Sequence, residues 1–144
     1  TWLLTRIVIT VPLAGALVRL GNLMNSEIYG KATDVPWAFI FTREDMLPRH
    51  PSQLYEAISY FFIFLFLFFF YKRNPLKINN TKLLGWFFIL LFSARFIIEY
   101  VKDIQVDFEK TMWINMGQIL SLPFILLGIY LIIKSTGSNA TKKV

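Results

Sequence analysis

The chain has 144 residues, of which 56% are hydrophobic and 17% aromatic, a more apolar composition than that of an ordinary soluble domain. Its formal net charge is +6, but the excess cations fall mainly between and after apolar segments, which favours cytoplasmic loops of a membrane protein and argues against a nucleic-acid partner. The absence of cysteine excludes disulfides, thiolate metal sites and a cysteine nucleophile within the chain.

Four apolar stretches are each long enough to cross a bilayer as a helix, which takes about 20 residues. They cover residues 3–20, 54–71, 83–101 and 116–133. The fourth contains Pro123, which a membrane bundle tolerates because neighbouring groups can satisfy the freed carbonyl. The expected fold is all-α: one membrane domain over residues 1–144, built as a polytopic transmembrane helix bundle of about four spans.

Charged residues in the connections predict the direction of the spans. The connection between the second and third spans and the tail after the fourth are basic, so both should be cytoplasmic by the positive-inside rule. Their cations are Lys72, Arg73, Lys77, Lys82, Lys134, Lys142 and Lys143. Residues 21–53 and 102–115 contain seven acids between them. We therefore expect these connections to face outward and the C-terminus to lie in the cytoplasm.

Ionisable side chains inside the spans need compensation, because an ionised group near the bilayer centre costs about 2.5–3.5 kcal/mol on insertion scales. They are Arg6, Arg19, Glu56, Arg95 and Glu99. Arg6 lies near the cytoplasmic start of its span and can snorkel, whereas the other four fall in the outward halves. Arg95 and Glu99 have the i, i+4 spacing of an intrahelical ion pair. Alternatively, Arg95 binds a lipid phosphate about 9 Å below the outer end of its span.

The first polar cluster is the stretch RLGNLMNSEIYG, residues 19–30. Arg19, Asn22 and Asn25 recur every three residues and would share one helix face. Either Arg19 snorkels while the Asn and Ser side chains cap a helix end, or the guanidinium group and the two amides form a binding site. The spacing alone favours neither interpretation.

The second polar cluster, RHPSQLYEA, directly precedes the Phe-rich span. Gln53, Glu56 and Tyr60 would line one helix face, while a proline suited to the first helical turn makes His50 or a neighbour a candidate cap. His50 is the only histidine and can act as an acid, a base or a phosphate donor near pH 7. No metal-ligand spacing occurs, so we expect neither a metal nor a cofactor.

The third polar cluster, NMGQILSLP, lies where the fourth span enters from outside. Asn115, Gln118 and Ser121 are spaced three residues apart and would again share a face. Each cluster alone has a structural explanation. Three clusters at one membrane surface predict a shared polar site at the outer leaflet.

These stretches resemble the signature motifs of the prolipoprotein diacylglyceryl transferase family. RLGNLMNSEIYG is similar to the pattern Gly-Arg-x-Gly-Asn-Phe-x-Asn followed by Glu and Gly, with Val18 and Leu23 as departures. RHPSQLYEA matches a His-Pro-Ser-Gln-Leu-Tyr-Glu segment without a gap, and ARFIIEY and NMGQILSLP resemble later motifs. The four motifs are in family order, and the chain resembles the C-terminal part of such an enzyme, without the N-terminal half and its His-Gly-Gly segment.

The resemblance implies a multi-pass enzyme of the bacterial inner membrane that moves the diacylglyceryl group of phosphatidylglycerol to a lipobox cysteine thiol in a prolipoprotein signal peptide. Its active site would face the periplasmic side, and the nucleophile would belong to the substrate. Arg19 and Arg95 would be catalytic, binding the headgroup and stabilising the leaving phosphate. Asn22, Asn25 and Glu27 would help to bind phosphatidylglycerol. The supporting residues would be Gly30, His50, Gln53, Tyr55, Glu56, Glu99 and Gln118.

Two other interpretations stay open on the sequence. A non-catalytic membrane subunit or small transporter would pair Arg19 and Arg95 with Glu56 or Glu99, without an open cavity. The enzyme would place both guanidinium groups in one outward cavity that is reachable from the bilayer. An inactive lipid-binding fragment would share this site but lack turnover, and the thiol-activating base is expected in the N-terminal half.

Overall fold

The computed structural model of the chain describes residues 2–43, 46–73, 79–102 and 116–141. Some of the charged and polar residues counted or named above lie outside these ranges. They are Glu44, Asp45, Lys77, Asp103, Asp107, Glu109, Asn115, Lys142 and Lys143.

Long helices confirm the predicted all-α transmembrane bundle. They are α1 (Trp2–Met24), α2 (Ser52–Arg73), α3 (Asn80–Ile98) and α4 (Met116–Thr141), and a short 3-10 helix, η1 (Glu99–Val101), continues α3. The described residues contain 4 helices that are long and apolar enough to cross a membrane. Helices α1, α2 and α4 extend past the predicted spans, whereas α3 begins three residues earlier than predicted and ends at Ile98, before η1. Asn79 caps the start of α3 by accepting hydrogen bonds from the backbone N–H groups of Thr81 and Lys82.

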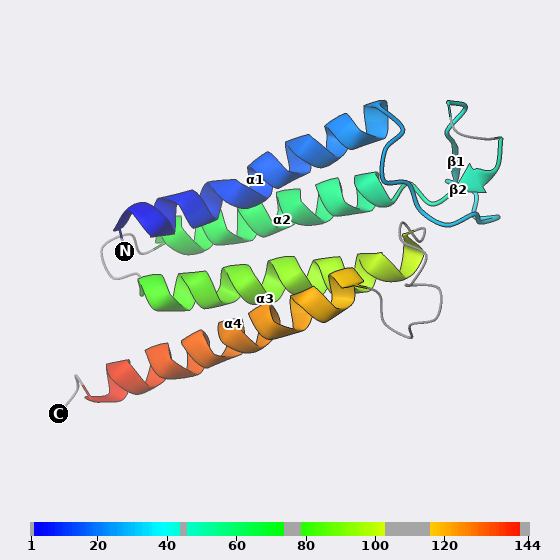
Figure 1. The fold of residues 1–144 in the computed structure, drawn as a ribbon. Helices are drawn as coiled ribbons and strands as arrows, with labels where there is room; N and C mark the ends of the chain where they lie inside the picture. Colours follow the sequence, from blue (N-terminus) through cyan, green and yellow to red (C-terminus); the bar gives the residue numbers. More distant parts are fainter. Residues whose placement is uncertain (1, 44–45, 74–78, 103–115, 142–144) are drawn as a thin grey trace.

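The helices form two neighbouring pairs (Figure 1). Helix α1 packs along α2 and α3 packs along α4, while α2 contacts α3 between the pairs. The end of α1, the start of α2, the end of α3 and the start of α4 lie together at one end of the bundle, beside the strands (Figure 1). We call this the hairpin end. Both chain termini lie at the opposite end, which we call the terminal end (Figure 1).

A buried apolar cluster joins α1, α2 and α3. Leu67 of α2 and Leu83 of α3 are fully buried, and Val8 and Ile9 of α1 belong to the same cluster. Many other apolar side chains on the helices are exposed, among them Phe62 at 63%. This pattern is expected where lipid replaces water, because a helix that is apolar on all sides need not bury every side in protein.

Two glycines bring α3 and α4 into close contact. A Cβ atom on Gly85 would lie 2.8 Å from the backbone oxygen of Gly128 and 2.7 Å from Cγ1 of Ile132. Small residues at helix crossings let backbones approach in a membrane bundle. Near the same interface, Phe92 and Phe124 stack with ring centroids 4.5 Å apart. The α3–α4 pair is therefore tightly packed along much of its length.

The connection between α1 and α2 contains a two-stranded antiparallel sheet, β1 (Phe39–Ile40) and β2 (Pro48–Arg49). The sequence analysis treated residues 21–53 as an outward loop and did not anticipate these strands. Phe and Ile favour extended structure, and the following Phe41 is buried and stacks on Tyr29 with ring centroids 5.9 Å apart. The sheet is a short addition to the predicted helical fold.

The terminal end holds the arginine that was expected to snorkel. Nη2 of Arg6 donates a hydrogen bond of 2.7 Å to the hydroxyl of Tyr71, and its guanidinium carbon lies 5.5 Å from the centre of that ring. Lys72 and Arg73 directly follow Tyr71 at the end of α2, and both are exposed. Arg6 thus bonds to a tyrosine at the helix end, and its snorkelling to the interface stays a prediction.

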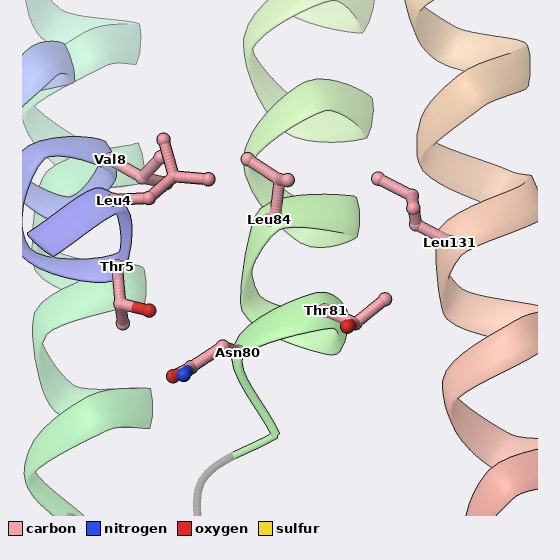
Figure 2. Close-up of a pocket in the computed structure, with 7 residues that line it drawn as sticks. All are labelled: Leu4, Thr5, Val8, Asn80, Thr81, Leu84 and Leu131. Carbon is pink, nitrogen blue, oxygen red and sulfur yellow. The ribbon is translucent and has the colours of Figure 1, made fainter. Parts of the chain in front are cut away.

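A cavity of about 90 Å³ also lies at the terminal end, between α1, α3 and α4 (Figure 2). Its walls are mainly apolar, with Leu4 and Val8 on one side, Leu84 in the middle and Leu131 on the other (Figure 2). Asn80 and Thr81 lie at its lower rim in this view. The cavity contains neither Arg19 nor Arg95, so it is not the shared outward cavity expected of the enzyme, which stays a prediction.

Candidate functional site at the hairpin end

The first motif forms a tight turn directly after α1. The backbone N–H of Glu27 donates to the carbonyl of Asn22 at 2.9 Å, which closes the end of the helix. Ser26 and Ile28 then adopt positive φ angles of 56° and 55°. A β-branched residue in this left-handed region is strained and persists only where the surroundings impose it. The turn between Asn22 and Ile28 must therefore be held by other parts of the molecule.

The second motif supplies these contacts from the start of α2. Oγ of Ser52 donates a 3.0 Å hydrogen bond to the carbonyl of Ile28, and Nε2 of Gln53 donates a 2.5 Å hydrogen bond to the carbonyl of Glu27. Ser52 is 0% exposed and Gln53 is 1% exposed. Buried hydrogen bonds of this kind are costly to remove. The two motifs are thus parts of one structure, and Gln53 has a supporting role in it.

Gly30 lies where three segments cross. Its backbone N–H donates to the carbonyl of His50 at 3.0 Å, and it pairs with Lys102 in a β-bridge. A Cβ atom on Gly30 would lie 2.5 Å from the oxygen of His50 and 2.8 Å from the oxygen of Val101. No other residue type fits between these backbones without movement. The glycine at position 30 of the first motif is therefore favoured for a steric reason, because a side chain would collide with these backbones.

Arg19 is held by groups from both motifs. Its Nε lies 2.5 Å from Oε2 of Glu56, and its Nη1 donates a 3.3 Å hydrogen bond to Oδ1 of Asn22. Nδ2 of Asn22 in turn donates to Oε2 of Glu27 at 3.0 Å. The predicted face is only partly realised, because α1 ends at Met24 and Asn25 is exposed beyond it, with no side-chain hydrogen bond among the described residues.

Glu56 bridges two cations. Its side chain is 0% exposed, and while Oε2 faces Arg19, Oε1 lies 2.5 Å from Nζ of Lys102. Lys102 is 7% exposed and also lies 3.0 Å from Oε1 of Glu99. Lys102 is not among the predicted site residues. It lies in the connection after the third span, whose charged residues served only to predict the direction of the spans. Its i+3 spacing from Glu99 was the available signal.

Arg95 reaches the same region from α3. Its Nε is buried and has no hydrogen-bond partner among the described residues. Tyr60 of α2 interacts electrostatically with Arg95, Arg19 and Glu56, and it lies within hydrogen-bonding reach of Arg19. Both arginines therefore lie close enough to one tyrosine to influence it electrostatically. Glu99, the partner of Arg95 in one of the two interpretations left open by the sequence, contacts Lys102.

His50 forms a separate polar chain next to this cluster. Nε1 of Trp37 donates to the hydroxyl of Tyr55 at 2.6 Å, and that hydroxyl lies 3.0 Å from Nδ1 of His50. At the start of α2 the backbone N–H of Tyr55 donates to the carbonyl of Pro51 at 3.1 Å, and that of Ser52 donates to the carbonyl of His50 at 2.9 Å. The His50 side chain thus bonds to Tyr55 and does not cap α2, and Tyr55 orients it.

The third motif packs helices together. Nε2 of Gln118 donates a 3.0 Å hydrogen bond to the carbonyl of Phe96, and Oγ of Ser121 donates to the carbonyl of Gly117 at 2.7 Å. A Cβ atom on Gly117 would lie 2.6 Å from Cδ of Glu99. Gln118 therefore joins α4 to α3, and the motif reaches the charged cluster through the contact of Gly117 with Glu99.

The charges at the hairpin end suit an anion. Three cations, Arg19, Arg95 and Lys102, accompany two buried or partly buried carboxylates, Glu56 and Glu99, so that these groups together carry one net positive charge. Glu27 reaches Arg19 only through Asn22 and is exposed. Within the described ranges, no group of three or more His, Cys, Asp or Glu side chains could hold a metal ion. A phosphate oxygen is the ligand that arginine forks bind best.

Comparisons with known proteins agree with these motifs. The family model for prolipoprotein diacylglyceryl transferase matches residues 1–134. A phosphatidylglycerol–prolipoprotein diacylglyceryl transferase of Bacteroides fragilis is 51% identical over 86% of this chain and 45% of its own length. Those of Tolumonas auensis and Chloroherpeton thalassium are each 48% identical, over 96% and 99% of this chain and 54% and 53% of theirs.

The chain spans about half the length of these curated relatives. No solved structure matches it. The family model nevertheless covers the first three helices and most of α4, including every residue of the charged cluster at the hairpin end. On this match, and with identities near one half over most of its residues, the chain belongs to the prolipoprotein diacylglyceryl transferase family.

Proposed function

We propose that this chain provides the phosphatidylglycerol headgroup site of a phosphatidylglycerol–prolipoprotein diacylglyceryl transferase. The family assignment supports the reaction, and the cluster of Arg19, Glu56, Lys102 and Arg95 supports the site. The observation that carries the proposal is the way Glu56 holds Arg19. The carboxylate contacts Nε, and Nη1 donates to Asn22, so these partners hold the guanidinium group in place while it keeps further N–H donors. A guanidinium group fixed in this way is preorganised for a phosphate.

In the proposed reaction, the sulfur of a lipobox cysteine attacks the glycerol carbon that carries the phosphate. A carbon–sulfur bond forms and the carbon–oxygen bond to the phosphate breaks. The thiol proton is lost, and glycerol phosphate leaves with the bonding electron pair on its oxygen. Arg19 and Arg95 stabilise the negative charge that develops on this oxygen. The thiol belongs to the prolipoprotein, and the base that accepts its proton belongs to the part of the enzyme outside this chain.

We further propose that the hairpin end faces the periplasm and that both ends of the chain face the cytoplasm. The exposed cations Lys72 and Arg73 lie at the end of α2, and Lys134 lies toward the end of α4. Cytoplasmic ends of membrane helices carry an excess of such cations. The site would then open at the outer leaflet of a bacterial inner membrane, where phosphatidylglycerol and the signal peptide can both reach it.

The test is a lipid-transfer assay on the complete natural protein that contains this sequence. It would be reconstituted with phosphatidylglycerol and a lipobox peptide, and thioether-linked product would be measured by mass spectrometry. We expect Arg19→Ala and Arg95→Ala each to reduce transfer about 100-fold or more, as for the loss of other preorganised charge-stabilising donors. Arg43→Ala is the matched control, because Arg43 is an exposed arginine in the connection between α1 and α2. Undiminished transfer in both site variants would overturn the assignment.

One observation favours a second candidate, a non-catalytic membrane subunit. That interpretation predicts an ion pair such as the one between Arg19 and Glu56. It also predicts a paired Arg95, whereas Nε of Arg95 is buried without a hydrogen-bond partner in the described part of the chain. Absence of transfer by the unsubstituted complete protein would favour the subunit. Transfer by the complete protein but not by this chain alone would identify the chain as a lipid-binding part of the enzyme.

A further inference from the structure

Lys102 is a buried cation to which the motifs assign no role. Its side chain is 7% exposed, and Nζ lies 2.5 Å from Oε1 of Glu56 and 3.0 Å from Oε1 of Glu99. A lysine at the end of a membrane span ordinarily carries its ammonium group outward to water. Here the backbone of Lys102 pairs with Gly30 in a β-bridge, and the side chain turns inward to the carboxylates.

The position of Lys102 changes the charge that Arg19 can offer. A carboxylate that binds one guanidinium group alone neutralises it. Glu56 instead divides its two oxygens between Arg19 and Lys102. Without Lys102, the two arginines would be balanced by Glu56 and Glu99. With Lys102, the cluster carries the one net positive charge that matches the single negative charge of a phosphodiester.

We propose that Lys102 is a positioning residue for an anionic phosphodiester headgroup. It offsets the charge of Glu56, so that Glu56 can fix the orientation of Arg19 without cancelling its attraction for phosphate. This inference rests on the proposed function, because the headgroup is that of phosphatidylglycerol. The role requires a cation at position 102 and no contact between its ammonium group and the lipid.

The inference gives Lys102 a specific effect on lipid choice. Loss of one buried charge should weaken the binding of an anionic lipid more than that of a lipid with no net charge. We expect Lys102→Met to weaken phosphatidylglycerol binding about tenfold, which corresponds to one modest buried charge interaction. Binding of phosphatidylcholine with the same acyl chains should change less than twofold. Lys102→Arg should restore most of the preference.

The test titrates the complete natural protein in detergent with phosphatidylglycerol or phosphatidylcholine and counts bound lipids by native mass spectrometry. Lys31→Met is the matched control, because Lys31 is an exposed cation beside the same β-bridge. Thermal unfolding of each variant shows whether it is folded. Equal phosphatidylglycerol binding by folded Lys102→Met and unsubstituted protein would overturn the inference, as would an equal loss of binding for both lipids.

A double variant separates charge from structure. Glu56→Gln together with Lys102→Met removes one charge of each sign, and so it restores the net positive charge that Lys102→Met removes. We expect the double variant to bind phosphatidylglycerol more tightly than Lys102→Met alone. A merely structural role for Lys102 predicts additive losses instead, and additive losses would refute the charge role.

The outcomes of this test differ from those of the proposed function. If the unsubstituted protein neither binds phosphatidylglycerol in preference to phosphatidylcholine nor transfers lipid, the proposed function fails, and the inference fails with it. If the unsubstituted protein does both and Lys102→Met does so equally well, the proposed function stands. In that case only the role of Lys102 is wrong.

Discussion

The two ends of the helix bundle hold their charged groups in different ways. At the hairpin end, Arg19, Glu56 and Lys102 come from three segments of the chain and bind one another with little exposure. At the terminal end, Arg6 bonds to the hydroxyl of Tyr71, and the cations that end α2 are exposed. Both ends contain an arginine within an apolar helix, so this residue type alone does not mark a site.

The difference lies in the cost of each arrangement. An arginine near a helix end can reach polar surroundings at low cost. A buried ion pair loses hydration for every charged group, and apolar residues of similar size often stabilise a protein as well or better. The charged cluster at the hairpin end is therefore a poor device for stability alone. Its strained turn, with Ile28 at a φ of 55°, likewise favours a functional explanation.

The largest effect on stability should follow from Glu56→Gln. This change leaves Arg19 without its carboxylate partner and Lys102 with Glu99 alone, and removal of one partner from a buried pair costs about 3–5 kcal/mol. The free energy of unfolding in bicelles measures the loss. Glu27→Gln is the control, since that carboxylate is exposed, and it should change stability by less than about 0.5 kcal/mol. Equal values for both variants would show that the buried carboxylate of Glu56 matters no more for stability than an exposed one.

A smaller loss should follow from Gly30→Ala. The new Cβ atom would lie 2.5 Å from the oxygen of His50 and must push the backbones apart. Such overpacking typically costs about 1–3 kcal/mol. Gly21→Ala, in which the new Cβ atom meets nothing within 4 Å, should be neutral or slightly stabilising because alanine favours helix. Unfolding free energies that rank the two variants in the opposite order would contradict the crossing at Gly30.

The smallest losses of stability should follow from the removal of one hydrogen bond at each end of the bundle. Ser52→Ala removes the bond to the carbonyl of Ile28 and should cost about 1 kcal/mol. It should also raise amide hydrogen exchange in the turn after α1. Tyr71→Phe removes the bond to Arg6 and should cost less, because Arg6 can reach other polar groups at the helix end. Faster exchange in that turn for Tyr71→Phe than for Ser52→Ala would show that the hydrogen bond of Ser52 does not hold the turn.

Hydropathy was sufficient to predict the helices, because bilayer thickness sets the length of each span. The convergence of the polar motifs followed from alternating span direction. It needed no side-chain detail. The internal geometry of the motifs was harder to predict from the sequence. A shared face of Arg19, Asn22 and Asn25 requires a helix that continues to Asn25, whereas α1 ends at Met24. Nothing in the sequence around Ile28 predicts a left-handed backbone conformation at this residue. The conformation is held by contacts with α2.

Lys102 was missed for a related reason. Its charge was counted toward the direction of the spans, where only the total matters. Its burial depends on the pairing of its backbone with Gly30, a contact between segments that are 72 positions apart in the chain. Gln118 depends on a tertiary contact as well, because its side chain bonds to the carbonyl of Phe96 on another helix. Its supporting role at the site stays a prediction.

The pairing of charges has a consequence for how the protein enters the membrane. The ion pair of Arg19 with Glu56 joins the first two helices, and that of Lys102 with Glu99 lies at the end of the third. Each helical hairpin can thus insert with one cation and one carboxylate already paired, which lowers the cost of carrying ionised groups into lipid. The contact between Glu56 and Lys102 then forms when the hairpins associate. Arg95 of α3 carries the one positive charge that these carboxylates do not balance.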